Sequence, residues 1–292
     1  MVAFGTVAMT SRGKCELSLA TRKLARAMSN QLFPALLRFW RGRRGLSQLD
    51  LALEAGVSAR HLSFLESGRA KPSADMALRL LSALHVPLRA QNEALRAAGL
   101  PARFPEPGLE ALDPQIERAL ARMLEQQEPF PLIVLGGDFG ILRRNRGAEA
   151  LFRAFIAEPA ALPAVPDIFT LLFHPQLLRP FVEAWPHFAR MQVGRLQREI
   201  LQRGGDDRLS ALLDRILAFP DVPASFRHPD FSTDAPAAQS FRLTRGTTSV
   251  GFLVAVTKFS APQQVLLDEL SVESCYPLDD ATRATCERLL SS

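Results

Sequence analysis

The sequence has few of the features that mark secreted, membrane-spanning or disulfide-stabilised proteins. It contains three cysteines, Cys15, Cys275 and Cys286, which are too few for a disulfide framework and favour a reducing compartment. No uninterrupted apolar run approaches the roughly 18 residues that a membrane-spanning helix needs. The mean hydropathy is +0.04. We therefore expect a cytoplasmic protein with no membrane partner.

Motifs that would indicate catalysis or cofactor binding are also missing. His174, His187 and His228 are scattered, and none belongs to an H-E-x-x-H pair. The chain has no G-x-S-x-G, no phosphate loop and no dinucleotide-binding G-x-G-x-x-G in its proper context. We expect no enzymatic activity, no catalytic residues and no cofactor. Cys275 and Cys286 lack C-x-x-C spacing, so we expect no metal site. A metal or redox sensor that uses these cysteines is the weaker alternative.

Charge is distributed unevenly along the chain. The formal net charge of the 292 residues is +5. Residues 1–100 carry 15 Lys and Arg against 6 Asp and Glu, whereas residues 101–292 carry 20 against 24. A basic first third predicts an anionic partner for that part alone, and the candidates are nucleic acid and an anionic membrane surface.

The length suits two ordinary domains. The sequence predicts a disordered tail at 1–30, a helical domain at 31–100, a Pro-rich linker at 101–112 and a second domain at 113–292. The linker is predicted because prolines, beginning at Pro101, interrupt helices and hold the chain extended. Both Met1 and Met28 are candidate starts of the chain.

The first domain has a dense helical pattern. Apolar residues recur at helical spacing from Gln31 onward, and Ser47, Ser58 and Ser73 stand where N-caps would begin three further helices. Pro87 precedes a fifth helix. The face of the first helix opposite its apolar stripe carries most of the basic residues Arg38, Arg41, Arg43 and Arg44.

The second and third of these helices have the spacing of a helix-turn-helix. Ala52 is small where the helices would cross, Gly56 suits a turn with positive φ, and Val57, Leu62 and Leu65 supply apolar anchors. An ordinary helical hairpin with a solvated polar face is the alternative. The exposed face offers short polar and basic groups for a major groove, namely Ser58, Arg60, His61 and Ser63.

The run R-G-L-S-Q…A…G-V-S…L-S…E-x-G-R-x-x-P-S resembles the xenobiotic-response-element type of helix-turn-helix, the lambda-repressor-like domain, over about residues 33–98. The resemblance implies an all-α, five-helix domain that binds double-stranded DNA, normally as a homodimer, so that DNA and not a membrane surface is the expected anionic partner. It implies phosphate contacts from Ser47 and Gln48, base contacts from Ser58, Ala59, Arg60 and Ser63, and a DNA backbone contact from Arg69. His61 stands beside these residues and is a further candidate.

The order of predicted strands and helices in the second domain indicates an α+β fold, with an antiparallel sheet and helices on one side. The predicted strands are 131–135, 139–143, 240–244, 249–258 and 265–274. The predicted helices are 113–127, 146–156, 175–202 with an interruption at Pro186, 207–218 and 280–290.

Three stretches of this domain, PLIVLGGDFGILRRNRGAEALF, PDIFTLLFHPQLLRPFVEAW and TKFSAPQQVLLDELSVESCYPLDDAT, resemble the MmyB-like ligand-binding domain. The similarity covers about residues 113–290. It implies a bacterial transcription regulator with a PAS-like sensor domain, whose pocket lies between sheet and helices and takes a fatty-acid-like or other apolar molecule. The sequence departs from the family near Gly137, Phe139 and Asp167.

Candidates for this pocket come from an aromatic-rich region and the arginines that follow it. Aromatic side chains would line the pocket, although core packing explains such residues equally well. An arginine would orient a carboxylate, and an asparagine would cap a helix or bond the ligand. The candidates are Asn145, Phe152, Phe169, Phe173, Trp185, Arg190 and Arg195. The alternative for the second domain is an antitoxin-like protein-interaction module.

Overall fold

The computed structural model describes residues 31–228 and 239–291. The predicted tail at 1–30, with Cys15, Met1 and Met28, lies outside them. The chain divides into two compact units, Met1–Phe104 and Pro105–Ser292. The division falls within the segment 101–112.

Five helices make up the described part of the first unit, as the sequence predicts. They are the helix at 31–43, α2 (Gln48–Glu54), α3 (Ala59–Glu66), α4 (Ala74–Ala83) and α5 (Leu88–Ala97). Ser47, Ser58 and Ser73 each accept a hydrogen bond from the backbone N–H three residues later. The three predicted caps are confirmed, and each satisfies a donor that the first turn of its helix leaves free.

A tight turn joins α2 to α3. Gly56 has φ +63, a conformation in which a residue with a side chain is strained. The N–H of Val57 then donates to the carbonyl of Ala52 at 2.8 Å. Ala52 is 2% exposed, and Leu62 is fully buried. The small residue and the glycine therefore occupy the places that a helix-turn-helix requires.

A buried carboxylate ties the first helix to this pair. Glu66, the last residue of α3, is 2% exposed. Its oxygens accept hydrogen bonds from Arg41 Nε and Nη2 at 2.6 and 2.9 Å, and from Gln48 Nε2 at 2.8 Å. Arg38 donates to the backbone carbonyl of Glu66. Because these donors lie on the helix at 31–43 and on α2, Glu66 fixes three helices relative to one another.

Three of the four arginines predicted on the outer face of the first helix serve the fold instead, since Arg38 also bonds to Glu66. Arg41 pairs with Glu66, and Arg44 donates to the carbonyl oxygens of Leu84 and His85 at 2.7 and 2.8 Å. A long guanidinium stem can reach around a helix to a polar group behind it, which a helical-face pattern does not reveal.

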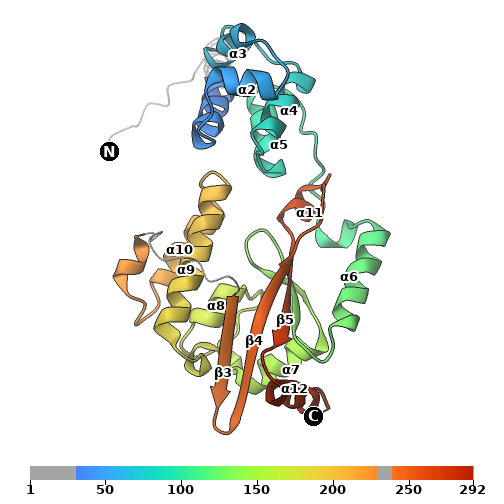
Figure 1. Cartoon of the computed structure of the whole chain (residues 1–292), viewed down its shortest axis with the longest axis vertical. Helices are drawn as coiled ribbons and strands as arrows, with labels where there is room; N and C mark the ends of the chain where they lie inside the picture. The colour runs from blue at the N-terminus through green and yellow to red at the C-terminus, as the bar shows by residue number, and fades with distance from the viewer. Residues whose placement is uncertain (1–30, 229–238, 292) are drawn as a thin grey trace, which may run out of the picture. The chain divides into compact units, whose positions relative to one another are not determined.

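The second unit is built on a five-stranded antiparallel sheet with the strand order β2-β1-β5-β4-β3 (Figure 1). The strands are β1 (Leu132–Leu135), β2 (Ile141–Arg144), β3 (Gln239–Arg245), β4 (Thr248–Thr257) and β5 (Ser271–Pro277). Its α-helices are α6 (Pro114–Gln126), α7 (Arg146–Phe155), α8 (Ile168–Phe173), α9 (Trp185–Gln202), α10 (Asp207–Leu217), α11 (Val265–Glu269) and α12 (Asp280–Ser291). The predicted α+β class is confirmed.

Helices cover both faces of the sheet, not one as expected (Figure 1). Val134 and Val272 pack with Leu120 of α6 in one apolar cluster. Ile133 and Phe252 belong to a larger core that includes residues of α7, α8, α9 and α10. The sequence Leu-Ile-Val-Leu of β1 is buried at all four positions, and an apolar run of this kind needs cover on both faces.

Two predicted elements differ from the structure. The helix predicted at 175–202 with a break at Pro186 is α9, which begins at Trp185 and holds Pro186 in its first turn. A proline is tolerated there because the N–H that it lacks would have no helical partner. The strand predicted at 265–274 is the helix α11 followed by β5. Periodicity alone does not separate a short apolar helix from a strand.

The Glu66 cluster gives a pH-dependent prediction. Burial raises the pKa of Glu66, but hydrogen bonds from Arg41 and Gln48, with the charge of Arg41 and Arg38, hold it below its usual value. A carboxyl with a lowered pKa adds stability above its unfolded pKa, about 4.3, and that stability is lost as the pH falls through the folded value. Glu66→Gln should lower the free energy of unfolding by about 2 kcal/mol at pH 7, because the partly buried guanidinium of Arg41 loses its charged partner.

Urea unfolding as a function of pH measures this difference. The wild type and Glu66→Gln should converge as the pH falls through the lowered pKa of Glu66, because its carboxyl then becomes neutral like the amide of glutamine. Glu54→Gln removes an exposed acid of α2 and serves as the control, with an expected change within about 0.5 kcal/mol. Equal stability of Glu66→Gln and the wild type at pH 7 would contradict the assigned role.

Candidate functional site

The first half of α3 presents a polar surface. Ser58 and Arg60 are exposed, whereas Ala59, His61 and Ser63 are half-buried. Leu62 and Leu65 hold the helix to the core, and Ala59 packs against the same cluster, so the exposed part of this surface is available to a partner. Five of the predicted DNA-contact residues therefore share one short stretch of helix surface.

An aromatic ring supports the most extended of these side chains. The guanidinium carbon of Arg60 lies 5.5 Å from the ring centroid of Phe64, one turn further along α3. Stacking on a ring restricts an arginine and reduces the entropy that it loses on binding. Arg69 is exposed and follows Gly68, which has φ +73. Both arginines thus stand at surface positions set by rigid neighbours.

The start of α2 is ordered by internal hydrogen bonds. The hydroxyl of Ser47 accepts from the N–H of Asp50 at 3.1 Å, and the carboxylate of Asp50 accepts from the N–H of Ser47 at 2.9 Å. Gln48 is half-buried and donates its amide to Glu66. The resemblance implies phosphate contacts from Ser47 and Gln48, yet a carboxylate already occupies this helix end.

The second unit encloses a small inner cavity between its sheet and α7, α8 and α9. The inner cavity measures about 50 Å³. Most of its lining is apolar, as at Ile133, Leu151 and Phe241. Arg195 and Glu273 form its charged part. An arrangement with apolar walls and few polar groups is typical of small-molecule sites.

The charged part of the inner cavity is an ion pair. Arg195 of α9 donates to Glu273 of β5, which is 5% exposed. The guanidinium carbon of Arg195 also lies 5.2 Å from the ring centroid of Phe139. Arg195 is the predicted partner of a ligand carboxylate, but such a carboxylate would have to compete with Glu273.

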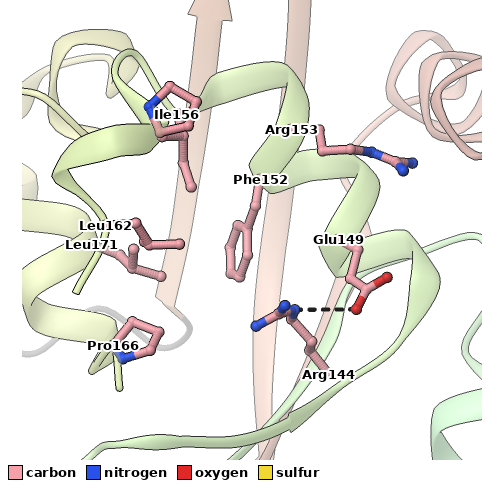
Figure 2. Close-up of a pocket in the computed structure, with 9 residues that line it drawn as sticks. Arg144, Glu149, Phe152, Arg153, Ile156, Leu162, Pro166 and Leu171 are labelled. Carbon is pink, nitrogen blue, oxygen red and sulfur yellow. Dashed lines mark ion pairs between the residues drawn. The ribbon is translucent and has the colours of Figure 1, made fainter. Parts of the chain in front are cut away.

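A larger outer cleft opens beside α7 and measures about 340 Å³ (Figure 2). It is lined by Arg144, Glu149, Phe152, Arg153, Ile156, Pro159, Leu162, Pro166 and Leu171. Figure 2 shows Phe152 between the apolar side chains Leu162 and Leu171 and the ion pair of Arg144 with Glu149. Phe152 lines the inner cavity as well, so one side chain borders both spaces.

The structure brings two of the seven predicted ligand residues to a cavity, Phe152 and Arg195. Phe169 and Phe173 are fully buried. Trp185 packs edge-on against Phe173, with ring centroids 5.0 Å apart. None of these three lines either cavity; Phe173 packs between the rings of Phe169 and Trp185.

Arg190 and Asn145 also lie away from both linings. The guanidinium carbon of Arg190 sits 5.0 Å from the ring centroid of Phe226. Asn145 is 5% exposed and caps α7; its Oδ1 accepts from the N–H of Ala148 at 2.9 Å and of Leu132 at 3.0 Å. Asn145 thus joins β1 to the start of α7.

Four charged residues of these cavities were not predicted from the sequence: Glu273 of the inner cavity, and Arg144, Glu149 and Arg153 of the outer cleft. Glu273 lies on the same face of β5 as Cys275, between buried residues. An acid at an inward position of a buried strand is a signal that could have been used, because it needs a partner. Arg144 ends β2 and carried no such signal.

The cysteines bear on the metal or redox alternative. Burial raises the pKa of Cys275, with help from the charge of Glu273, and burial raises the pKa of Cys286 to about 11. Both thiols therefore stay protonated near neutral pH, which disfavours reaction or metal binding. Across 31–228 and 239–291, no three ligating side chains gather as a metal site would need.

Among the helices that the structure describes, none is both long and apolar enough to cross a bilayer.

Comparison with known proteins identifies both units. The model of the MmyB-like transcription regulator ligand binding domain matches residues 116–289, and a helix-turn-helix model matches residues 37–91. No curated protein matches significantly. One solved structure, an RNA-binding light-oxygen-voltage receptor, aligns at 12% identity and a TM-score of 0.24 over 98% of this chain and 69% of the other. The first family model covers more than half of the chain, which therefore belongs to the MmyB-like transcription regulators, proteins with a helix-turn-helix and a ligand-binding domain.

Proposed function

We propose that this DNA-binding transcription regulator senses a small apolar molecule of the fatty-acid type, in the cytoplasm of a bacterium. The observation that carries the proposal is that the second unit, whose family binds ligands, contains two apolar-walled spaces, the inner cavity and the outer cleft. Both matching families are regulatory and neither is enzymatic. A ligand that binds one conformation better than another shifts the population between them, and DNA binding changes accordingly. Repression and activation are both compatible with this scheme.

On the DNA side, we propose that α3 enters the major groove with Arg60 foremost. The exposed polar face of α3 and the basic charge of the first third support this assignment. Phosphate contacts would supply affinity and base contacts would supply sequence choice. The proposed contact residues are Ser47, Gln48, Ser58, Ala59, Arg60, His61, Ser63 and Arg69.

We further propose that the protein binds DNA as a homodimer. One small helical domain makes few contacts, and a dimer doubles them. Two copies would read an inverted repeat whose half-sites lie about one helical turn, 34–36 Å, apart. A footprint over a single asymmetric half-site, together with a monomer mass in solution, would overturn this arrangement.

Arg60→Ala tests the assignment of α3. The substitution should weaken operator binding by about 1–3 kcal/mol and relax preference at one base position, if Arg60 reads a guanine. Selection from random duplexes with the wild type and the variant measures both effects. Arg79→Ala, at an exposed arginine of α4 that pairs with Asp75, is the control and should leave base preference unchanged. An unaltered preference in Arg60→Ala would refute its reading role.

Native mass spectrometry of the purified full chain tests the sensor. We expect a non-covalently bound molecule of lipid size, and we expect its removal to change operator affinity in an electrophoretic mobility assay. A second polypeptide bound in its place would favour the protein-interaction module. Operator affinity that is the same with and without the bound molecule would contradict the sensing role.

A further inference from the structure

The outer cleft and the inner cavity differ in what they can hold. Ligand pockets usually measure roughly 300–1,000 Å³, a range that includes the outer cleft at about 340 Å³ but not the inner cavity at about 50 Å³. The cation of the inner cavity, Arg195, is already paired with buried Glu273. A charged head group would therefore find both room and an available cation more easily in the outer cleft.

Arg144 is the cation that faces this cleft. Its Nε lies 3.4 Å from Glu149 Oε1, and their side chains are 40% and 48% exposed, so water screens the pair. The side chain of Arg144 donates no hydrogen bond to any residue that the structure describes. Figure 2 shows its guanidinium directed below the ring of Phe152 toward Pro166, whereas the guanidinium of Arg153 points away from the apolar side chains. N–H groups of the Arg144 guanidinium are therefore available to a ligand at the edge of the apolar wall.

The opposite wall of the cleft is apolar. It comes from α7, from the connection between α7 and α8, and from α8 itself, through Phe152, Leu162, Pro166 and Leu171 (Figure 2). A hydrocarbon chain gains free energy by covering such a surface, and a carboxylate gains charge-assisted hydrogen bonds from a guanidinium. The two features together match an amphipathic molecule with one anionic end.

We propose that the outer cleft binds an alkyl carboxylate, with the carboxylate on Arg144 and the chain against Phe152. This inference rests on the proposed sensing function and adds the place and polarity of binding. The carboxylate of Glu149 competes with the ligand carboxylate for the guanidinium of Arg144. Because the pair of Arg144 and Glu149 is exposed and weak, the ligand can replace it. Phe152 separates the bound chain from the inner cavity, since it borders both spaces.

The test compares decanoate with decan-1-ol, which has the same chain and no charge. Isothermal titration calorimetry is carried out on the full chain after bound lipid has been removed on a hydrophobic resin. The wild type should bind decanoate about tenfold more tightly than decan-1-ol. Arg144→Gln should remove this preference by weakening decanoate alone. Arg146→Gln, at an exposed neighbour on α7 that lines neither space, is the matched control and should keep the preference.

Glu149→Gln gives an effect of the opposite sign. Removing the competing carboxylate should strengthen decanoate binding by about threefold and leave decan-1-ol within about twofold of the wild type. This gain would not follow from a merely structural role of the pair, and it keeps the test decisive if Arg144→Gln folds poorly. A loss of decanoate affinity in Glu149→Gln would overturn the assigned competition.

The outcomes separate this inference from the proposed function. Equal binding of decanoate and decan-1-ol by the wild type, unchanged in Arg144→Gln, would overturn the carboxylate site and leave an apolar sensor intact. Failure of both compounds to bind the wild type would instead reject the apolar ligand class, and the carboxylate site with it.

Discussion

Each unit of the protein is organised around a carboxylate that is buried beside an arginine. Glu66 lies with Arg41 at the junction of three helices, and Glu273 lies with Arg195 between the sheet and α9. Taking a lone carboxylate out of water costs several kcal/mol, so each acid is tolerable only with its guanidinium in place. The positions of α3 and of the inner cavity therefore depend on two ion pairs, each of which joins segments far apart in the sequence.

This use of arginine changes how the charge of the chain is interpreted. The excess of basic residues in the first third predicts a nucleic-acid partner, but Arg41 and Arg44 hold helices together and offer less to a phosphate. The same holds in the second unit, where Arg195 is neutralised by Glu273. The available positive charge at each surface must be sought in arginines that are not paired with a buried carboxylate. Arg60 on α3 and Arg144 at the outer cleft are two such arginines.

Local signals in the sequence predicted much of the fold. The caps Ser47 and Ser58 and the turn residue Gly56 lie where expected, because each depends on atoms within a few residues along the chain. Features that depend on distant partners were missed. The helix α11 and the placement of α6 on the second face of the sheet follow from packing between segments more than 100 residues apart, which periodicity does not contain.

The candidate ligand residues show the same limit more sharply. Aromatic composition predicted a pocket, yet Phe169 and Phe173 fill the core, and of the predicted aromatic residues Phe152 alone lines the two spaces described above. A cleft arises where neighbouring elements fail to supply enough side-chain volume. The connection at 157–166 consists mostly of alanine and proline. Of its residues, Pro159, Leu162 and Pro166 line the outer cleft, and Ala161 packs against the core. Proline lacks the N–H with which the segment could pair closely with a neighbour. The outer cleft therefore depends on this connection as much as on Phe152, and aromatic composition alone did not indicate it.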